Sequence, residues 1–138
     1  MAMQKGSQQD GNSQETILIV DDEDSVRKLV EKTLRRHGYQ TLGAASGPQA
    51  ISMAEAFAGR IDLALIDLMM PDMSGRETYQ RLRETRPNLQ VIYMSGYSQL
   101  MALTEKFAEP GAAFLGKPYT LAGLVSRVQQ MLKTTIDI

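Results

Sequence analysis

Acidic side chains that directly follow two apolar runs are the clearest candidates for chemistry in this chain. The sequence Asp-Asp-Glu-Asp at residues 21–24 follows the apolar run 17–20, and Asp67 follows the run 63–66. Two carboxylates 4 Å apart repel each other by about 4 kcal/mol at an effective dielectric constant of about 20. A site that gathers them therefore needs a shared proton, an ammonium group or a bound cation. Oxygen ligands without His or Cys select a hard cation, of which Mg²⁺ is typical and Mn²⁺ an alternative.

A hydroxyl group and an ammonium group follow two further apolar runs. Ser95 and Gly96 come directly after residues 91–94, and Lys117 comes shortly after residues 112–115. Either side chain alone is common at the end of a strand without any function. If the runs are neighbouring parallel strands, however, both groups are expected beside the carboxylates, and Lys117 neutralises part of their charge.

Helix capping is the structural alternative for the acidic residues. An isolated Asp after a strand is usually the N-cap of the next helix, and Asp24 or Ser25 is expected to have that role. Capping accounts for at most one of Asp21 and Asp22. It accounts poorly for Asp67, which is followed by Leu-Met-Met-Pro and not by the start of a helix. The combined pattern on four of five strand ends therefore favours a functional site.

The elements that position these residues alternate along the chain. The expected strands are residues 17–20, 41–45, 63–66, 91–94 and 112–115. The segments between them have helical spacing: one with apolar residues from Val26 to Leu34 that stops at Gly38, one that opens at Ser46, one from Ser74 that ends before Pro87, one from Ser98 to Phe107, and one from Leu121 to Leu132. The alternation predicts an α/β fold, a doubly wound five-stranded parallel sheet flanked by five helices, flavodoxin-like (βα)5. In such a sheet the carboxyl ends of the strands share one edge, where ligands bind.

Composition limits the classes of protein to consider. The 138 residues carry 15 Lys and Arg against 16 Asp and Glu, for a net charge of −1, and there is no Cys. Disulfides and Cys-containing metal sites are excluded, and the charge balance argues against direct binding of nucleic acid or a polybasic membrane contact. No apolar run approaches the roughly 20 residues of a membrane span. We expect a soluble cytoplasmic domain at residues 16–133, with a polar tail or linker at 1–15 and a short tail at 134–138.

Four segments together resemble the receiver domain of two-component response regulators. They are ILIVDDED at residues 17–24, LALIDLMMPDMSG at 63–75, VIYMSGYS at 91–98 and FLGKPYT at 114–120. Their order and spacing match over residues 16–133. The last two segments are most similar to receivers at the C-terminus of hybrid sensor histidine kinases. The chain is therefore expected either to stand alone or to be excised from such a kinase.

The resemblance implies a role for each residue at the strand ends. Asp67 matches the phosphoacceptor, which takes a phosphoryl group from a phosphohistidine. Asp21, Asp22 and Asp67, with the backbone carbonyl of Met69, match the ligands of Mg²⁺ or Mn²⁺. The domain is then no enzyme, and only phosphorylates and dephosphorylates itself.

Further roles are implied around the phosphoryl group. Lys117, Ser95 and the N–H group of Gly96 would bind its oxygens, and the Lys117–Pro118 peptide bond is cis in the family. Ser95 and Phe114 match the residues that move on switching. Met69 and Tyr97 match positions that tune the lifetime of the acyl phosphate. Both are bulky here, which predicts slow self-dephosphorylation.

The resemblance also implies partners. These are a sensor histidine kinase or a histidine phosphotransfer protein, and a homodimer through the expected fourth helix, the fifth strand and the last helix. His37, the sole histidine, lies beside Gly38 at a helix end, so a cation at a helix C-terminus is preferred over a phosphotransfer role.

Two rival functions remain open on the sequence. Residues 22–26, Asp-Glu-Asp-Ser-Val, also fit the pattern of haloacid-dehalogenase-type phosphatases, with Asp22 as nucleophile. That alternative leaves Asp67 without a role, and the chain is short for such an enzyme with its cap domain. A flavodoxin-like cofactor binder is the second rival, but four consecutive acids would repel a phosphate in the absence of a metal.

Overall fold

The apolar runs of the sequence form five parallel strands. The computed structural model of the chain describes residues 14–96, 112–117 and 119–136. Its strands are β2 (Thr16–Val20), β3 (Gln40–Ala44), β4 (Leu63–Asp67), β5 (Gln90–Gly96) and β6 (Ala112–Lys117). Its helices are α1 (Asp24–Arg36), α2 (Gly47–Ala56), α3 (Gly75–Thr85) and α5 (Leu121–Ile136). Each predicted strand is confirmed to within two residues at either end. The helix predicted from Ser98 lies outside the described residues.

The order of the strands confirms a doubly wound sheet. The described strands are arranged β3-β2-β4-β5-β6, and every neighbouring pair is parallel. The chain first moves outward from β2 to β3 and then crosses back to β4 on the other side of β2. The carboxyl ends of β2 and β4 therefore flank the point where the winding reverses, which is where sheets of this kind bind ligands.

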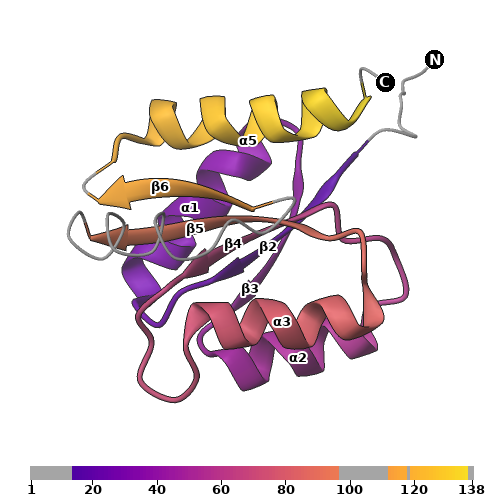
Figure 1. Cartoon of the computed structure of the whole chain (residues 1–138). Coiled ribbons are helices and arrows are strands. Elements are labelled where there is room, and N and C mark those ends of the chain that lie inside the picture. Colours follow the sequence, from indigo (N-terminus) through magenta and orange to yellow (C-terminus); the bar gives the residue numbers. More distant parts are fainter. Residues whose placement is uncertain (1–13, 97–111, 118, 137–138) are drawn as a thin grey trace.

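Helices cover both faces of the sheet, as Figure 1 shows, with α1 and α5 on one face and α2 and α3 on the other. Alternate residues of each strand point to opposite faces. Ile17 and Ile19 of β2 thus pack in the cluster that includes Val30 of α1, whereas Leu18 and Val20 belong to the second cluster. All five residues of β2 and of β4 are buried, which explains why these strands are almost continuously apolar.

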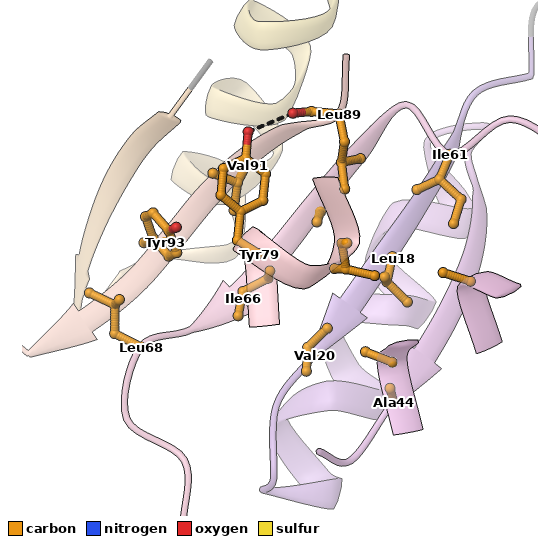
Figure 2. Packing of buried hydrophobic residues seen from close by; sticks show 14 residues of the cluster. Leu18, Val20, Ala44, Ile61, Ile66, Leu68, Tyr79, Leu89, Val91 and Tyr93 are labelled. Atoms are coloured by element: carbon orange, nitrogen blue, oxygen red, sulfur yellow. Dashed lines mark hydrogen bonds between the residues drawn. The ribbon is translucent and has the colours of Figure 1, made fainter. Parts of the chain in front are cut away.

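In the cluster under α2 and α3, the hydroxyl group of Tyr79 finds its hydrogen-bond partner inside the protein. The hydroxyl group of Tyr79 donates a hydrogen bond of 2.6 Å to the carbonyl oxygen of Leu89, drawn as a dashed line in Figure 2. The Tyr79 ring meets Tyr93 edge-on, with centroids 5.9 Å apart. Tyr93 in turn lies 5.5 Å from the ring of Phe114. A chain of aromatic contacts thus runs from α3 across β5 to β6.

The predicted helix ends are confirmed except at the start of α1. Gly38 has φ of 94° after α1, and the Ser46 and Ser74 hydroxyl groups accept the backbone N–H groups of Gln49 and Glu77. The prediction that Asp24 or Ser25 caps α1 is wrong.

The N-cap of α1 is Glu23, and it makes no side-chain cap bond. Asp21 Oδ1 accepts the Glu23 N–H at 2.9 Å, and the helix begins directly after this turn, at Asp24, so that Asp24 and Ser25 lie inside the helix and not at its cap. Asp24 lies inside the first turn, 2.7 Å from Arg27 Nη2.

Arg86 joins two segments at the amino ends of the strands. Its guanidinium donates to the carbonyl oxygens of Ala54, Phe57 and Gly59, at 3.0, 2.9 and 3.1 Å. These carbonyls lie at the end of α2 and just beyond it, where no further helical N–H group is available. One side chain from the end of α3 thus satisfies the end of its neighbour α2.

Among the described residues, none of the helices combines the length and hydropathy that crossing a lipid bilayer demands.

Candidate functional site

Three carboxylates meet at the carboxyl edge of the sheet. Asp21 follows the last residue of β2, Asp67 is the last residue of β4, and the register pairs Val20 with Ile66, so the two aspartates are neighbours. Together with Asp22 they bring one oxygen each to within 4.8 Å of the others. The structure thus gathers the three acidic residues that the strand ends predicted to converge.

Asp21 is fully buried and only partly satisfied. Its Oδ1 atom accepts the N–H of Glu23, whereas Oδ2 is buried with no hydrogen-bond partner among the described residues. Burial raises the pKa of Asp21. The Glu23 N–H group opposes that increase, and the charge of Asp67 adds to it. An oxygen atom that is buried, anionic and without a partner is suited to binding a cation.

Lys117 supplies a positive charge beside Asp67. Its Nζ atom lies 3.3 Å from Asp67 Oδ2, and the two side chains are 31% and 8% exposed. Burial alone lowers the pKa of Lys117, but the charges of Asp67 and Asp21 outweigh burial and raise it above its usual value. The ammonium group is therefore held in its charged form beside the carboxylate.

The loop after β4 presents Met69 at the rim of the site. The Met69 N–H group donates to Asp67 Oδ1 at 3.2 Å, and its side chain is 61% exposed. The loop is tied to the sheet by the Leu68 N–H group, which donates to the Met94 carbonyl oxygen at 3.0 Å. Both oxygens of Asp67 thus have a donor, one from Met69 and one from Lys117.

The remaining predicted residues lie on β5 and β6. Ser95 is buried and follows Met94, which is the register partner of Asp67, while Gly96 pairs with Lys117. Phe114 is half-buried, and its ring contacts Tyr93. Tyr97 and Pro118, and with Pro118 the predicted cis bond, lie outside the described residues.

His37 lies away from this site, at the C-terminus of α1, where its Nδ1 atom is 3.0 Å from the carbonyl oxygen of Thr33.

Sequence reasoning missed Gly75, which lets the start of α3 approach Asp67 closely. A Cβ atom on this residue would collide with the carbonyl oxygen of Asp67, and the Gly75 N–H group donates to the Leu68 carbonyl at 3.0 Å. In the sequence, Gly75 is the last residue of the segment 63–75 and lies beside the helix start expected at Ser74, and neither feature indicates a close contact. Gly75 is needed because the start of a helix closely approaches the end of a strand, and no local sequence pattern indicates such an approach.

Arg27 and Tyr119 also lie near the site, and the sequence did not predict either of them as part of it. Arg27 Nη1 donates to the backbone carbonyl of Asp21 at 2.8 Å. Tyr119 is half-buried, and burial followed by the charge of Asp21 raises its pKa. Tyr119 lines a cavity of about 510 Å³ together with Lys117 and the start of α1. Arg27 shares a helix face with apolar residues, so the sequence alone did not connect it to the site.

The donor set fits a hard divalent cation. All three side-chain groups are carboxylates, two of them are buried, and one buried oxygen of Asp21 has no described partner. Mg²⁺ usually takes one or two carboxylates and completes its shell with water and phosphate oxygens. The arrangement therefore has the oxygen ligands for such an ion and one ammonium group beside them.

Known proteins share both the sequence and the fold. The family model described as the response regulator receiver domain matches residues 17–129. The sensor kinase CckA of Brucella abortus is 36% identical over 118 residues, which are 86% of this chain and 12% of that protein. Sporulation initiation phosphotransferase F of Bacillus subtilis is 33% identical, over 86% of this chain and 94% of that protein.

A solved structure gives the same result. The crystal structure of the receiver domain from the hybrid histidine kinase CckA superposes with a TM-score of 0.73 at 38% identity, over 85% of this chain and 98% of that chain.

This chain belongs to the response regulator receiver domain family. Members of the family are phosphoacceptors in two-component phosphorelays, and the relatives include a hybrid kinase and a phosphotransferase. The expected fold and family are confirmed. The phosphatase alternative, with Asp22 as nucleophile, has no support from these comparisons.

Proposed function

We propose that this receiver domain accepts a phosphoryl group on the carboxylate of Asp67. In that step an Asp67 oxygen forms a bond to phosphorus while the phosphorus–nitrogen bond of a phosphohistidine breaks, which leaves an acyl phosphate and a free imidazole. One observation carries the proposal: Asp67 lies between Lys117, at 3.3 Å, and two further carboxylates. Among the described acids, this aspartate combines an ammonium partner with a place in the carboxylate cluster.

The surrounding groups would stabilise the charge of the transferred group. Asp21, Asp22 and Asp67, with the carbonyl of Met69, would hold Mg²⁺, which supplies positive charge beside the phosphoryl oxygens. Lys117 would pair with one of these oxygens. The Ser95 hydroxyl and the Gly96 N–H group, at the end of the neighbouring strand, would donate to the others. Phosphoryl transfer needs this positioning and charge more than it needs acid or base groups.

Phosphorylation is proposed to act on partners through Ser95 and Phe114. The Phe114 ring packs against Tyr93, two residues before Ser95 on β5, so a shift of Ser95 toward the phosphoryl group changes the packing of that ring. The donor would be a sensor histidine kinase or a histidine phosphotransfer protein. We also propose that the receiver domain spans residues 16–133. The predicted homodimer face falls partly outside the described residues and stays a prediction.

The test is incubation with acetyl phosphate and Mg²⁺, followed by intact-mass measurement. We expect one phosphoryl group on the wild-type chain and none on Asp67→Asn. The matched control is Asp72→Asn, which changes an exposed aspartate five residues further along and should still take one group. A modification that survives in Asp67→Asn would refute the assignment, as would steady release of phosphate that persists in Asp67→Asn.

A further inference from the structure

Arg27 connects α1 to the loop that carries the acidic residues. Its Nη1 atom donates to the backbone carbonyl of Asp21 at 2.8 Å, and its Nη2 atom lies 2.7 Å from Asp24 Oδ1. The side chain is only 12% exposed. A guanidinium group is planar and holds its donors in a fixed fork, so two contacts from one side chain define the position of the group between them.

Arg27 is itself held in place from its own helix. Its Nε atom lies 3.8 Å from Glu31 Oε2, and Glu31 also pairs with Arg35 at 3.3 Å. Two acids of α1 therefore contact the guanidinium group, Asp24 and Glu31. The Asp24 side chain is 69% exposed and the Glu31 side chain is 18% exposed. The Arg27 backbone N–H group donates to the Glu23 carbonyl at 2.9 Å, which continues the helix into the same loop.

The backbone of Asp21 is consequently fixed at both of its polar groups. Its N–H group donates to the Ala44 carbonyl of β3 at 3.1 Å, and its carbonyl accepts from Arg27. The Asp21 side chain is buried and closes the turn to Glu23. The peptide that carries the buried carboxylate is therefore held by β3 on one side and by a cation on the other. This arrangement opposes the mutual repulsion of Asp21, Asp22 and Asp67.

We propose that Arg27 is a positioning residue for the cation site: through the Asp21 carbonyl it holds the β2–α1 loop so that Asp21 and Asp22 face Asp67. The contacts of the Arg27 side chain are to the Asp21 carbonyl oxygen, Asp24 and Glu31, so its proposed effect on the site runs through the Asp21 backbone. The inference rests on the proposed function, because it assumes that these carboxylates bind Mg²⁺. It adds a residue outside the carboxylate cluster whose loss weakens binding of the cation.

A purely structural role for Arg27 makes a different prediction. Ion pairs along one helix at spacings of three and four stabilise that helix modestly, and Arg27 makes such pairs with Asp24 and Glu31. Arg35 offers a matched control, because it pairs with the same Glu31 and otherwise bonds to Thr41, away from the loop. A helix-stabilising role predicts similar effects for Arg27→Ala and Arg35→Ala. A positioning role predicts an effect on Mg²⁺ that only the first shows.

The test is titration of the full chain with MgCl₂ while the backbone amide NMR signals of residues 21–24 are followed, with no phosphodonor present. We expect Arg27→Ala to weaken Mg²⁺ binding about tenfold or more, the range typical for loss of groups that orient metal ligands. Arg35→Ala should bind Mg²⁺ within about twofold of wild type, as expected for a surface ion pair. Arg27→Lys should fall between, about threefold weaker, because one ammonium cannot serve Asp21 and Asp24 in the same fork geometry.

A second measurement uses phosphorylation by acetyl phosphate at increasing Mg²⁺. For Arg27→Ala, the Mg²⁺ concentration that gives half the maximal rate should rise about tenfold, while the rate at saturating Mg²⁺ stays within about twofold of wild type. A loss of folded protein that Mg²⁺ does not reverse would lower the maximal rate and leave the half-saturating concentration unchanged.

Wild-type Mg²⁺ affinity in Arg27→Ala overturns the proposal, and so does an equal loss in Arg35→Ala. If Arg27→Ala does not fold, the Mg²⁺ affinity of Arg27→Lys is the test. Wild-type affinity in Arg27→Lys would overturn the proposal, because it would show that the two contacts of the guanidinium group are not needed. Failure of the proposed function shows separately, as a phosphoryl group that remains on Asp67→Asn. The NMR comparison of the Arg27 variants does not depend on that result.

Discussion

Asp21 shows how a single residue couples stability to cation binding. Burial raises its pKa above the ordinary value of 3.8, because the charged carboxylate is desolvated and one of its oxygens has no described partner. The folded chain therefore holds the Asp21 proton more tightly than the unfolded chain does. The charged Asp21 carboxylate therefore lowers the free energy of unfolding at every pH above its folded pKa. This destabilisation decreases as the pH falls from the folded pKa toward 3.8.

Asp21→Asn should accordingly stabilise the chain in the absence of divalent cations. We expect the free energy of unfolding at pH 7 to rise by about 1–3 kcal/mol, because the change removes the buried negative charge and its repulsion from Asp67. The gain should shrink as the pH is lowered. Urea unfolding with a chelator present, at several pH values, measures both effects.

The control for this change is Asp22→Asn, which neutralises a neighbouring carboxylate that is exposed. Its free energy of unfolding should change by less than about 0.5 kcal/mol. An Asp21→Asn chain that is no more stable than wild type would show that the buried charge carries no net cost.

Met69 bears on the lifetime of the acyl phosphate proposed at Asp67. Its side chain is exposed beside the site and has no donor or strong acceptor with which to orient a water molecule. We expect slow self-dephosphorylation in wild type and loss several-fold faster in Met69→Asn. The check is decay of the phosphorylated chain followed by intact mass.

The control for Met69 is Leu29→Asn, which places the same amide on another exposed apolar residue, 50% exposed on α1. Its decay should match that of wild type. A half-life of seconds in the wild-type chain would contradict the expectation.

The sequence predicted those site residues whose signal is their place at a strand end. Asp21, Asp67 and Lys117 each follow an apolar run, and parallel strands bring such ends together, so their convergence required no tertiary information. Arg27 and Gly75 could not be found in this way. Arg27 acts through a backbone carbonyl six residues earlier, and Gly75 is needed because α3 approaches a strand end closely. Both depend on distances that only the folded chain defines.

The same distinction holds at the scale of helices and strands. Gly38, Ser46 and Ser74 act within three or four residues, and each was predicted correctly. The cap of α1 was not, because the turn that Asp21 closes onto Glu23 is followed directly by the helix at Asp24. Local patterns thus predicted the helix ends except where the site itself changes the hydrogen bonding.

Arg86 provides a prediction at the scale of the helices. Its three bonds join the end of α3 to the end of α2 at the edge of the sheet opposite the site. Arg86→Ala leaves these carbonyls without their charged donor, and we expect a loss of about 2–4 kcal/mol in the free energy of unfolding. Urea unfolding measures this loss.

Two comparisons test whether the effect of Arg86 is confined to that edge. Arg60→Ala removes a more exposed arginine, 75% exposed and 3.0 Å from Asp62, and should cost less than about 1 kcal/mol. Mg²⁺ affinity should be unchanged in Arg86→Ala. A marked loss of Mg²⁺ binding would mean that the two ends of the sheet are coupled.

At the scale of the whole molecule, cation binding should stabilise the fold. The carboxylates come from the loop after β2 and from the end of β4, so they are close together only in the folded chain. A ligand that binds the folded state alone adds about 2.7 kcal/mol when its free concentration is a hundred times its Kd. Urea unfolding in MgCl₂ should show this increase, whereas NaCl at equal ionic strength should not. Equal effects of the two salts would indicate screening of the acidic cluster without a specific site.

The ion pair between Lys117 and Asp67 has a consequence for the edge of the sheet. Asp67 ends a strand in the middle of the sheet, whereas Lys117 ends β6, which is hydrogen-bonded to β5 alone in the described sheet, so the pair reaches across β5. An edge strand has half the backbone hydrogen bonds of a central one. The charge on Asp67 therefore helps to hold this edge strand in register. Hydrogen–deuterium exchange of the β6 amides should therefore respond to changes in the charge of Asp67, two strands away.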